Sequence, residues 1–563
     1  MEKERRLVWQ VIGSTFENKR RRLSLKGANT LPFLTPNNGS LNPYLLMGPT
    51  LLAAFLFSWS IFHSDLSKRE AREGVPVVNM MRGGNIWLPQ INPQQLRTKP
   101  PLFYWSGLLT SKIFGKVSEV SLRIPSVLAG IGTVFLTTFL GMRQFSAAIG
   151  CLAGLIIATC WRFAYLGSHA RIDMLFTFFI TLAFVALWEL SRDEKKSFKW
   201  FAGLAIGLAV LTKGPLGWLF PLLAIFLYSR FHKSFRVPWA YLLVLPLTMA
   251  ALWLGVGFMA GGEEFSQMIY QETVGRVSGS EAIHIHPKPF YYYIPQIFGG
   301  MAPWSLFLPF ALWHGKKYQD VPWKFCLIAL ATLFIFLSLF PGKRGDYLLP
   351  LYPMGAVILG VFISRAKEGL TIPTRIVIGI MILLSLVLAF GALLPELNFD
   401  SLSLNSRDRW MAQLLYDKHR PSILFLALST VSMLAFAYAL VLHKNSGMKI
   451  SGVITGWAFL LYLGVHGPAA RIVNEHTSFR PFAEELKQIS ENRPLFNYGK
   501  AREDLLYYLD SPITETYDVP QQSNALLLIK KSQSQAWLQK HSDQKVLLET
   551  NGVFEPYQLI GKK

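Results

Sequence analysis

The sequence predicts an α-helical polytopic membrane protein of about 13 transmembrane helices with a small C-terminal α/β soluble domain. Of its 563 residues, 51% are hydrophobic and only 16% are charged, whereas charged residues make up roughly 25% of a soluble chain. Apolar stretches of about 18 to 23 residues, the length that crosses a bilayer, recur from Tyr44 to about His466. After about residue 467, strand-like and helical patterns alternate instead, which is typical of a soluble α/β unit.

These stretches divide the chain into three parts. Residues 1–43 form a basic N-terminus, residues 44–466 a transmembrane domain with two large exterior loops at 64–122 and 261–297, and residues 467–563 the α/β domain. The predicted spans lie at 44–63, 123–142, 146–166, 172–191, 199–213, 214–231, 238–260, 298–313, 322–341, 346–365, 374–394, 420–442 and 449–466.

The distribution of positive charge predicts the orientation. The formal net charge is +22, from 56 Lys and Arg against 34 Asp and Glu. The N-terminus carries a basic run at 19–22, and alternate loops are basic, so the positive-inside rule places the N-terminus in the cytoplasm and the C-terminal domain outside. Most of the basic surplus then sets orientation against membrane lipids, and we expect no nucleic-acid partner.

A minority of ionisable residues falls at span ends or in loops on the exterior side, where charges are costly and functional by default. Snorkelling to headgroups is the plain alternative for each cation, a helical pair for Glu272 with Arg276, and an ordinary loop position for the histidines. The shared face nevertheless indicates a cationic pocket for a lipid-borne phosphate. The residues are Lys99, Arg171, Asp173, Lys213, Glu272, Arg276, His284, His286, Lys288, Lys343, Arg344 and Asp346.

Short motifs around these residues resemble those of one family. They are Glu70-Ala71-Arg72, Lys99-Pro100 with Tyr104-Trp105, Arg123-Ile124-Pro125-Ser126, Asp173, Thr212-Lys213-Gly214, Glu272 with Arg276, His286 before Pro289 to Tyr292, and Gly342-Lys343-Arg344 through Tyr347 and Pro350. In these motifs, over about residues 44–360, the chain resembles the polyprenyl-phosphate-dependent glycosyltransferases of the C superfamily. The resemblance is to the bacterial branch of the lipid A aminoarabinose transferases and relatives of the protein O-mannosyltransferases.

The resemblance implies a glycosyltransferase of the bacterial inner membrane. It would move a sugar from a polyprenyl (undecaprenyl) phosphate donor to a lipid A, glycolipid or protein acceptor on the periplasmic face. The implied roles are donor phosphate binding by Lys99, Lys213, Lys343 and Arg344; substrate binding by Arg72, Glu272, Arg276, His286 and Tyr347; and catalysis by Glu70, Asp65 and Asp173.

Two departures from the family pattern bear on this expectation. Arg69 stands where the family has its catalytic acid, so we expect Glu70 or Asp65 to supply the carboxylate. Thr98 stands where an acidic residue often precedes the family's Lys-Pro, so no metal ligand is assigned and a divalent cation stays an open alternative.

Two other classes of protein remain open. An anionic-lipid transporter or flippase would use the same cations without chemistry, although the sequence shows no internal inverted repeat. A catalytically inactive homologue that only binds polyprenyl phosphate is the other, because of Arg69.

Overall fold

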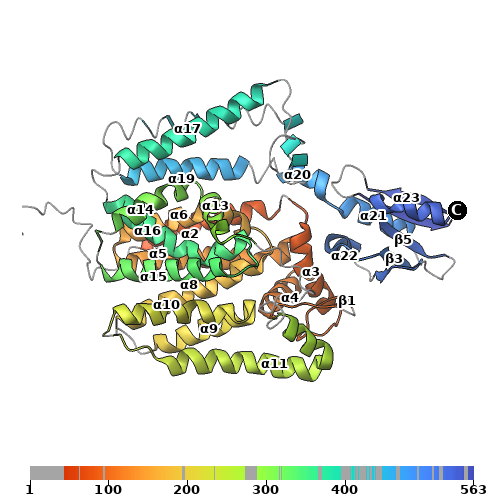
Figure 1. Cartoon of the computed structure of the whole chain (residues 1–563), viewed down its shortest axis with the longest axis horizontal. Helices are drawn as coiled ribbons and strands as arrows, with labels where there is room; N and C mark the ends of the chain where they lie inside the picture. Colours follow the sequence, from red (N-terminus) through yellow and green to blue (C-terminus); the bar gives the residue numbers. More distant parts are fainter. Residues whose placement is uncertain are drawn as a thin grey trace, which may run out of the picture.

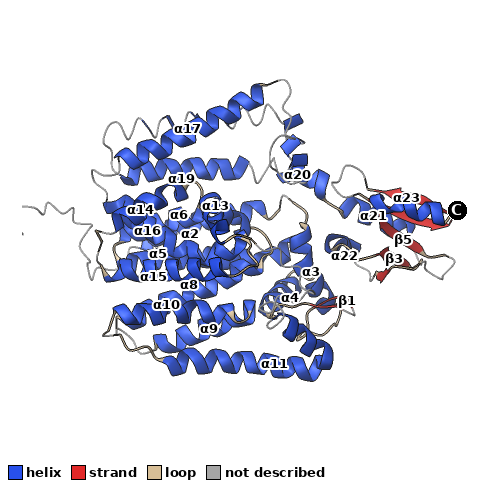
Figure 2. Ribbon diagram, in the orientation of Figure 1, coloured by secondary structure: helices blue, strands red, loops and turns tan. Residues whose placement is uncertain are grey.

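The structure is a computed structural model, and it is dominated by helices (Figure 2). It describes residues 43–62, 64–92, 95–192, 197–233, 235–272, 288–315, 317–318, 320–365, 371–394, scattered positions within 406–438, and then 447–464, 470–490, 493–509, 513–518, 524–550 and 556–562.

Long apolar helices form the body of the molecule, side by side (Figure 1). Six helices of the described part are long and apolar enough to cross a membrane, or seven if the bent pair α6–α7 is one span. The helices of the body, which include shorter ones, are α2 (Pro43–Ser60), α5 (Glu119–Gln144), α6 (Ala147–Ala158), α7 (Trp161–Gly167), α8 (Ile172–Ser191), α9 (Phe198–Lys213), α10 (Leu216–Phe231), α11 (Trp239–Tyr270), α13 (Tyr293–Gly300), α14 (Leu308–Gly315), α15 (Val321–Leu339), α16 (Tyr352–Arg365), α17 (Thr371–Leu393) and α19 (Gly447–Gly464).

Several predicted spans differ from the observed helices. The span predicted at 146–166 is the pair α6–α7, bent by 70°. The span predicted at 298–313 is broken into α13, the 3-10 turn η3 (Trp304–Phe307) and α14. Most of 420–442 lies outside the described residues, so the count of thirteen stays a prediction.

The break predicted at Lys213 has a local cause. Helix α9 ends at Lys213, and Gly214 adopts φ 75° before α10 begins at Leu216. A positive φ of this size is strained for residues with a Cβ but open to glycine. The Lys-Gly pair therefore terminates one helix and leaves the lysine at its end.

The described part of residues 64–122 is folded; we keep for this segment its predicted name, the first exterior loop. Helix α3 (Lys68–Met81) begins at a capping box in which the Ser67 hydroxyl accepts from the Glu70 N–H and the Glu70 carboxylate accepts from the Ser67 N–H. A short antiparallel pair, β1 (Gln90–Asn92) and β2 (Gln95–Leu96), then leads to α4 (Leu102–Ile113).

The C-terminal segment contains a five-stranded mixed sheet in the order β4-β3-β5-β7-β6. Strands β3 (Leu495–Tyr498), β5 (Leu526–Lys530) and β6 (Gln544–Glu549) coincide with the strand-like runs of the sequence at 494–498, 525–529 and 545–549. The sequence pattern did not predict β4 (Thr514–Thr516) or β7 (Tyr557–Lys562). Helices α21 (Arg480–Ile489), α22 (Glu503–Leu509) and α23 (Lys531–Lys540) accompany the sheet, and α20 (Ala470–Thr477) leads into it. We call residues 470–562 the C-terminal unit; it lies at the same end of the helix bundle as α3 and α4 (Figure 1).

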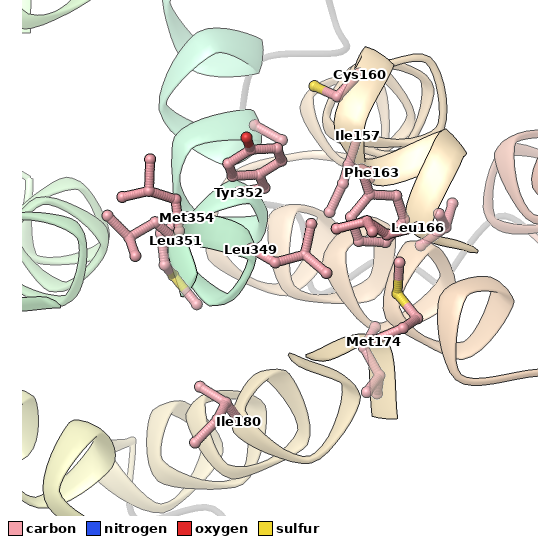
Figure 3. Close-up of a cluster of buried hydrophobic side chains, with 14 of the residues drawn as sticks. Ile157, Cys160, Phe163, Leu166, Met174, Ile180, Leu349, Leu351, Tyr352 and Met354 are labelled. Atoms are coloured by element: carbon pink, nitrogen blue, oxygen red, sulfur yellow. The ribbon is translucent and has the colours of Figure 1, made fainter. Parts of the chain in front are cut away.

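A buried apolar cluster fixes the segment that enters α16. The 3-10 helix η4 (Gly345–Leu351) precedes α16, and its Leu349 and the following Tyr352 lie beside Phe163 and Leu166 of α7 (Figure 3). All four side chains are at most 2% exposed. This packing holds the start of η4 against the start of α8, where the polar residues of the next section meet.

Candidate functional site

Charged residues from six segments meet at the end of the helix bundle that carries α3 and α4 (Figure 1). They come from the start of α3, the segment after β2, the start of α8, the end of α9, the residues just after α11 and the start of η4. We call this set the charged cluster; its members are Arg69, Lys99, Arg171, Asp173, Lys213, Glu272, Arg344 and Asp346.

Asp346 is at the centre of one half of the cluster. Its Oδ2 accepts a hydrogen bond from the Arg171 guanidinium and lies 3.7 Å from Nη1 of Arg69. The Asp346 side chain is 16% exposed and helps line a small cavity next to Tyr165 and His169. A carboxylate is thus held by two arginines at the edge of solvent.

The other half of the cluster contains two lysine–carboxylate pairs. Lys213 binds the carboxylate of Asp173, and Lys99 binds that of Glu272. The Lys213 ammonium also lies 4.4 Å from the ring centroid of Tyr347, a cation–π distance. Arg171 and Lys99 act electrostatically on Asp173 as well, so the two halves are continuous.

Lys343 and Arg344 are adjacent but differ in environment. The Lys343 ammonium is buried and donates to the backbone carbonyls of Lys288 and Phe340. Arg344 is exposed, and no acidic partner for it is found among the residues that the structure describes. Its charge acts on Arg69, which places it at the mouth of the cluster.

Glu70 is enclosed by protein donors. It is 1% exposed and accepts from Arg123 at 2.8 Å (Nε to Oε1), from the Ala170 N–H at 3.0 Å and from both donors of Ser67. Burial raises the pKa of Glu70, but the Arg123 guanidinium outweighs this and holds the pKa well below its usual range. These contacts favour a positioning role, because Glu70 ties α3 to α5 and to the backbone just before Arg171.

The Arg-x-Pro-Ser motif serves the same segment. The Arg123 guanidinium also donates to the carbonyls of Ile61, Ser64 and Asp65. Three residues later, the Ser126 hydroxyl accepts from the Arg171 N–H at 2.9 Å and donates to its carbonyl. Both motif residues therefore fix the backbone that carries Arg171 into the charged cluster.

Asp65 faces the C-terminal unit. Its carboxylate accepts from the Ser478 hydroxyl at 2.7 Å and the Asn474 amide at 3.2 Å, and it lies 3.4 Å from Nη1 of Arg480. The next residue, Leu66, donates its N–H to the Tyr508 hydroxyl at 2.7 Å. Asp65 thus links the first exterior loop to the C-terminal unit.

A buried triad anchors the strand that leads to Lys99. Arg97 donates to both oxygens of Glu73, at 2.8 and 2.7 Å, and the Tyr104 hydroxyl donates to Glu73 Oε2 at 2.8 Å. Burial raises the pKa of Glu73, but the positive charges of Arg97 and Arg72 lower it by more, so the pKa lies below its usual value. Because Arg97 is two residues before Lys99, the triad sets the position of that lysine.

The remaining predicted site residues fall in three groups. Arg72 lies with its Nε 3.6 Å from the Glu73 carboxylate, and Tyr347 lies in η4 under Lys213. Arg276 and His286 lie outside the described residues. Within the described part, no group of three His, Cys, Asp or Glu side chains has the arrangement of a metal site.

Sequence reasoning counted Arg171 and Asp346 among the ionisable residues of the exterior side but gave them no individual role, and it noted Arg69 only as a departure from the family pattern. The available signal was the Gly-Asp that follows Lys343-Arg344, because an acid beside two cations at a span end is unusual. Its partner Arg171 is 175 residues away, so the pairing becomes visible only in the fold.

Part of the chain is similar in sequence to known proteins. Residues 98–256 match the family model described as dolichyl-phosphate-mannose-protein mannosyltransferase. An uncharacterised Aquifex aeolicus protein is 30% identical over 290 residues, covering 51% of this chain and 57% of the relative. An undecaprenyl phosphate-alpha-4-amino-4-deoxy-L-arabinose arabinosyl transferase of Pseudomonas aeruginosa is 29% identical over 308 residues, covering 53% and 55%. The chain thus spans just over half the length of these relatives.

The fold extends the likeness further than the sequence does. The crystal structure of ArnT from Cupriavidus metallidurans bound to undecaprenyl phosphate aligns with a TM-score of 0.76 and 17% identity, covering 92% of this chain and 97% of that one. The fold is therefore that of this ArnT structure, and a part of the chain, residues 98–256, matches the mannosyltransferase family model. The similarity to an aminoarabinose transferase agrees with the resemblance that the motifs predicted.

Proposed function

We propose that this protein transfers a sugar from a polyprenyl phosphate donor to an acceptor at the exterior face of the bacterial inner membrane. The observation that carries the proposal is the charged cluster, in which cations and carboxylates from six segments meet at one end of an apolar helix bundle. The relatives support the donor class, since one is named for an undecaprenyl phosphate-linked sugar and another was crystallised with undecaprenyl phosphate.

The charge of the cluster suits a phosphate whose charge grows during reaction. Five cations face three carboxylates in it, leaving a net charge of about +2. A sugar phosphodiester carries about −1, whereas a phosphate monoester approaches −2 near neutral pH because its second pKa is about 6. Fixed cations therefore stabilise the departing polyprenyl phosphate more than the donor, which lowers the barrier.

Arg344 is the leading phosphate ligand. It is exposed at the mouth of the cluster, whereas Lys99 and Lys213 are each bound to a carboxylate and Lys343 is bound to backbone carbonyls. A guanidinium can hold two phosphate oxygens at once. Lys99 and Lys213 then add positive charge to the site while each stays paired with its carboxylate.

Asp346 is the leading carboxylate for proton transfer. Glu70 lines the same small cavity as Asp346 but is 1% exposed and bound by Arg123. Asp65 is bound by Ser478 of the C-terminal unit, whereas Asp346 is 16% exposed and lies among the cations of the cluster. In the proposed step, Asp346 takes the proton of an acceptor hydroxyl, the hydroxyl oxygen bonds to the anomeric carbon, and the bond from that carbon to the phosphate oxygen breaks. The electron pair stays on the polyprenyl phosphate, and the proton stays on Asp346 until water removes it.

An apolar cavity offers room for part of the polyprenyl chain. It has a volume of about 350 Å³ and lies between α2, α7, the α13–η3 turn and α19. Leu56, Trp161, Ala164 and Trp457 are among its walls. Burial of isoprenoid surface there would contribute roughly 25 cal/mol per Å², and this binding is independent of the sugar.

The proposal can be tested by mass spectrometry of glycolipids and glycoproteins from a strain that lacks the gene. We expect a sugar substituent to be missing, and to be restored by the wild type and by Lys540→Ala, an exposed control on α23. Arg344→Ala should fail to restore it. Unchanged glycans in the deletion strain, or full restoration by Arg344→Ala, would overturn the proposal; restored lipid translocation without sugar transfer would instead indicate a transporter.

A further inference from the structure

A second cavity lies where the first exterior loop meets the C-terminal unit. Its volume is about 420 Å³. One side is formed by the last turn of α3 and the segment between α4 and α5, and the other side by α21 and α22. None of the site residues predicted from the sequence lines it, so the proposed transfer chemistry leaves it unexplained.

The walls of this cavity are positively charged. Four basic residues face two acidic ones, and both acids contact Arg480, at 3.0 Å from Glu484 and 3.5 Å from Glu119. Tyr508 also donates to Glu119. Exposed lysines contribute to the positive excess: Lys116 on one side of the cavity and Lys487 on the other.

The same cavity has an apolar side next to an exposed apolar surface. Val78, Met81 and Val117 contribute to its walls. Just before Lys116 in the chain, Ile113 and Phe114 are 73% and 52% exposed. Exposed apolar residues beside lysines at the end of a helix are typical of segments that lie in a membrane interface. An anion bound here would therefore have lipid next to it.

Helix α3 sets the distance between this cavity and the charged cluster. Arg69 in its first turn reaches Asp346, whereas Met81 at its end lines the cavity. At 1.5 Å per residue, the two turns are about 18 Å apart. A molecule in the cavity could contact the reacting atoms only if it were itself large, as a lipid with a saccharide headgroup is.

We infer that this cavity binds the phosphate-bearing headgroup of a membrane lipid and, resting on the proposed function, that this lipid is the sugar acceptor. Lys116 and Lys487 would contact a bound phosphate from opposite sides of the cavity, since Lys116 belongs to the first exterior loop and Lys487 to α21. The acceptor class is then an anionic glycolipid, and the C-terminal unit forms half of its binding site.

Binding can be tested by native mass spectrometry of the full-length protein in a neutral detergent. The ligands are phosphatidylglycerol, phosphatidylcholine and soluble sn-glycerol 3-phosphate. We expect the double variant Lys116→Glu/Lys487→Glu to bind phosphatidylglycerol about ten-fold or more weakly than the wild type. Lys112→Glu, a matched exposed lysine on α4 outside the cavity, should bind like the wild type. Equal affinity of the double variant, or displacement of phosphatidylglycerol by equimolar glycerol phosphate, would overturn a lipid-headgroup site.

The acceptor role has its own readout. With donor saturating, the double variant should raise the acceptor KM about ten-fold and leave the donor KM unchanged. An unchanged acceptor KM would overturn the acceptor role. If wild-type protein transfers no sugar but still binds phosphatidylglycerol through these lysines, the proposed function fails while the lipid site stands.

Discussion

Asp346 and Arg69 form an ion pair of 3.7 Å at the mouth of the charged cluster, between the first exterior loop and η4. In the related family, the position of Arg69 is the one expected to hold an acid. The pair therefore places a carboxylate next to that position from another segment of the chain. The site therefore keeps a carboxylate, that of Asp346, although Arg69 occupies the position of the family's acid.

An exchange of the two side chains tests this relationship. Asp346→Asn should lower kcat by about 10² to 10⁴, the range for loss of a general base. Asp346→Arg and Arg69→Asp should each be severely impaired, and the double variant Arg69→Asp/Asp346→Arg should recover part of the activity. The measurement is the rate of sugar transfer by each variant in proteoliposomes. No recovery in a folded double variant, together with near-normal activity of Asp346→Asn, would remove Asp346 from the reaction.

The Glu70–Arg123 pair should matter chiefly for stability. Both side chains are at most 1% exposed, and loss of one partner leaves the other charge buried. We expect Glu70→Gln to lower the free energy of unfolding by about 3–5 kcal/mol, measured by denaturant titration in detergent. Glu484→Gln breaks an exposed i,i+4 pair with Arg480 and should change it by about 0.5 kcal/mol. Equal effects of the two substitutions on the free energy of unfolding would show that the buried pair contributes no more to stability than the exposed pair.

The same pair predicts how stability depends on pH. Folding lowers the pKa of Glu70, so the unfolded chain binds more protons in acid. This contribution is therefore fully present above the unfolded pKa of about 4.3 and is lost as the pH falls further. The difference in unfolding free energy between the wild type and Glu70→Gln should shrink from pH 7 to pH 3.5. A difference that stays constant over this range would contradict the assignment.

The Glu73–Arg97–Tyr104 triad should act on the donor through Lys99. Tyr104→Phe removes one donor to the buried Glu73 carboxylate, at a cost of about 1–3 kcal/mol. Because the triad holds the strand before Lys99, we expect the donor KM to rise several-fold with a smaller change in kcat. Tyr291→Phe, at a tyrosine that is 55% exposed, is the matched control. Tyr104→Phe with an unchanged donor KM would show that the triad only stabilises the fold.

The sequence predicted those features that depend on local patterns. The apolar lengths located most helices, and Lys213-Gly214 marked a real break because the glycine adopts a positive φ. Most strands and helices of the C-terminal unit were also visible, but α20, β4 and β7 were not predicted. Each of these follows from residues that are close together in the chain.

Contacts between distant segments were beyond sequence reasoning. Glu70 was predicted to be catalytic from its motif, but its partners Arg123 and Ala170 come from α5 and from the segment before α8. The link from Asp65 to Ser478 spans 413 residues. Periodicity locates such charges near a membrane face, but only the packing of helices decides which of them pair.

The most direct test of the account is a transfer assay with purified protein in proteoliposomes, using a radiolabelled sugar on undecaprenyl phosphate. We expect one undecaprenyl phosphate to be released for each sugar transferred, and Arg344→Ala to reduce the rate by about 10² or more, while Lys540→Ala matches the wild type. Transfer by Arg344→Ala at the wild-type rate, or no transfer by the wild type with any lipid or protein acceptor, would contradict the account.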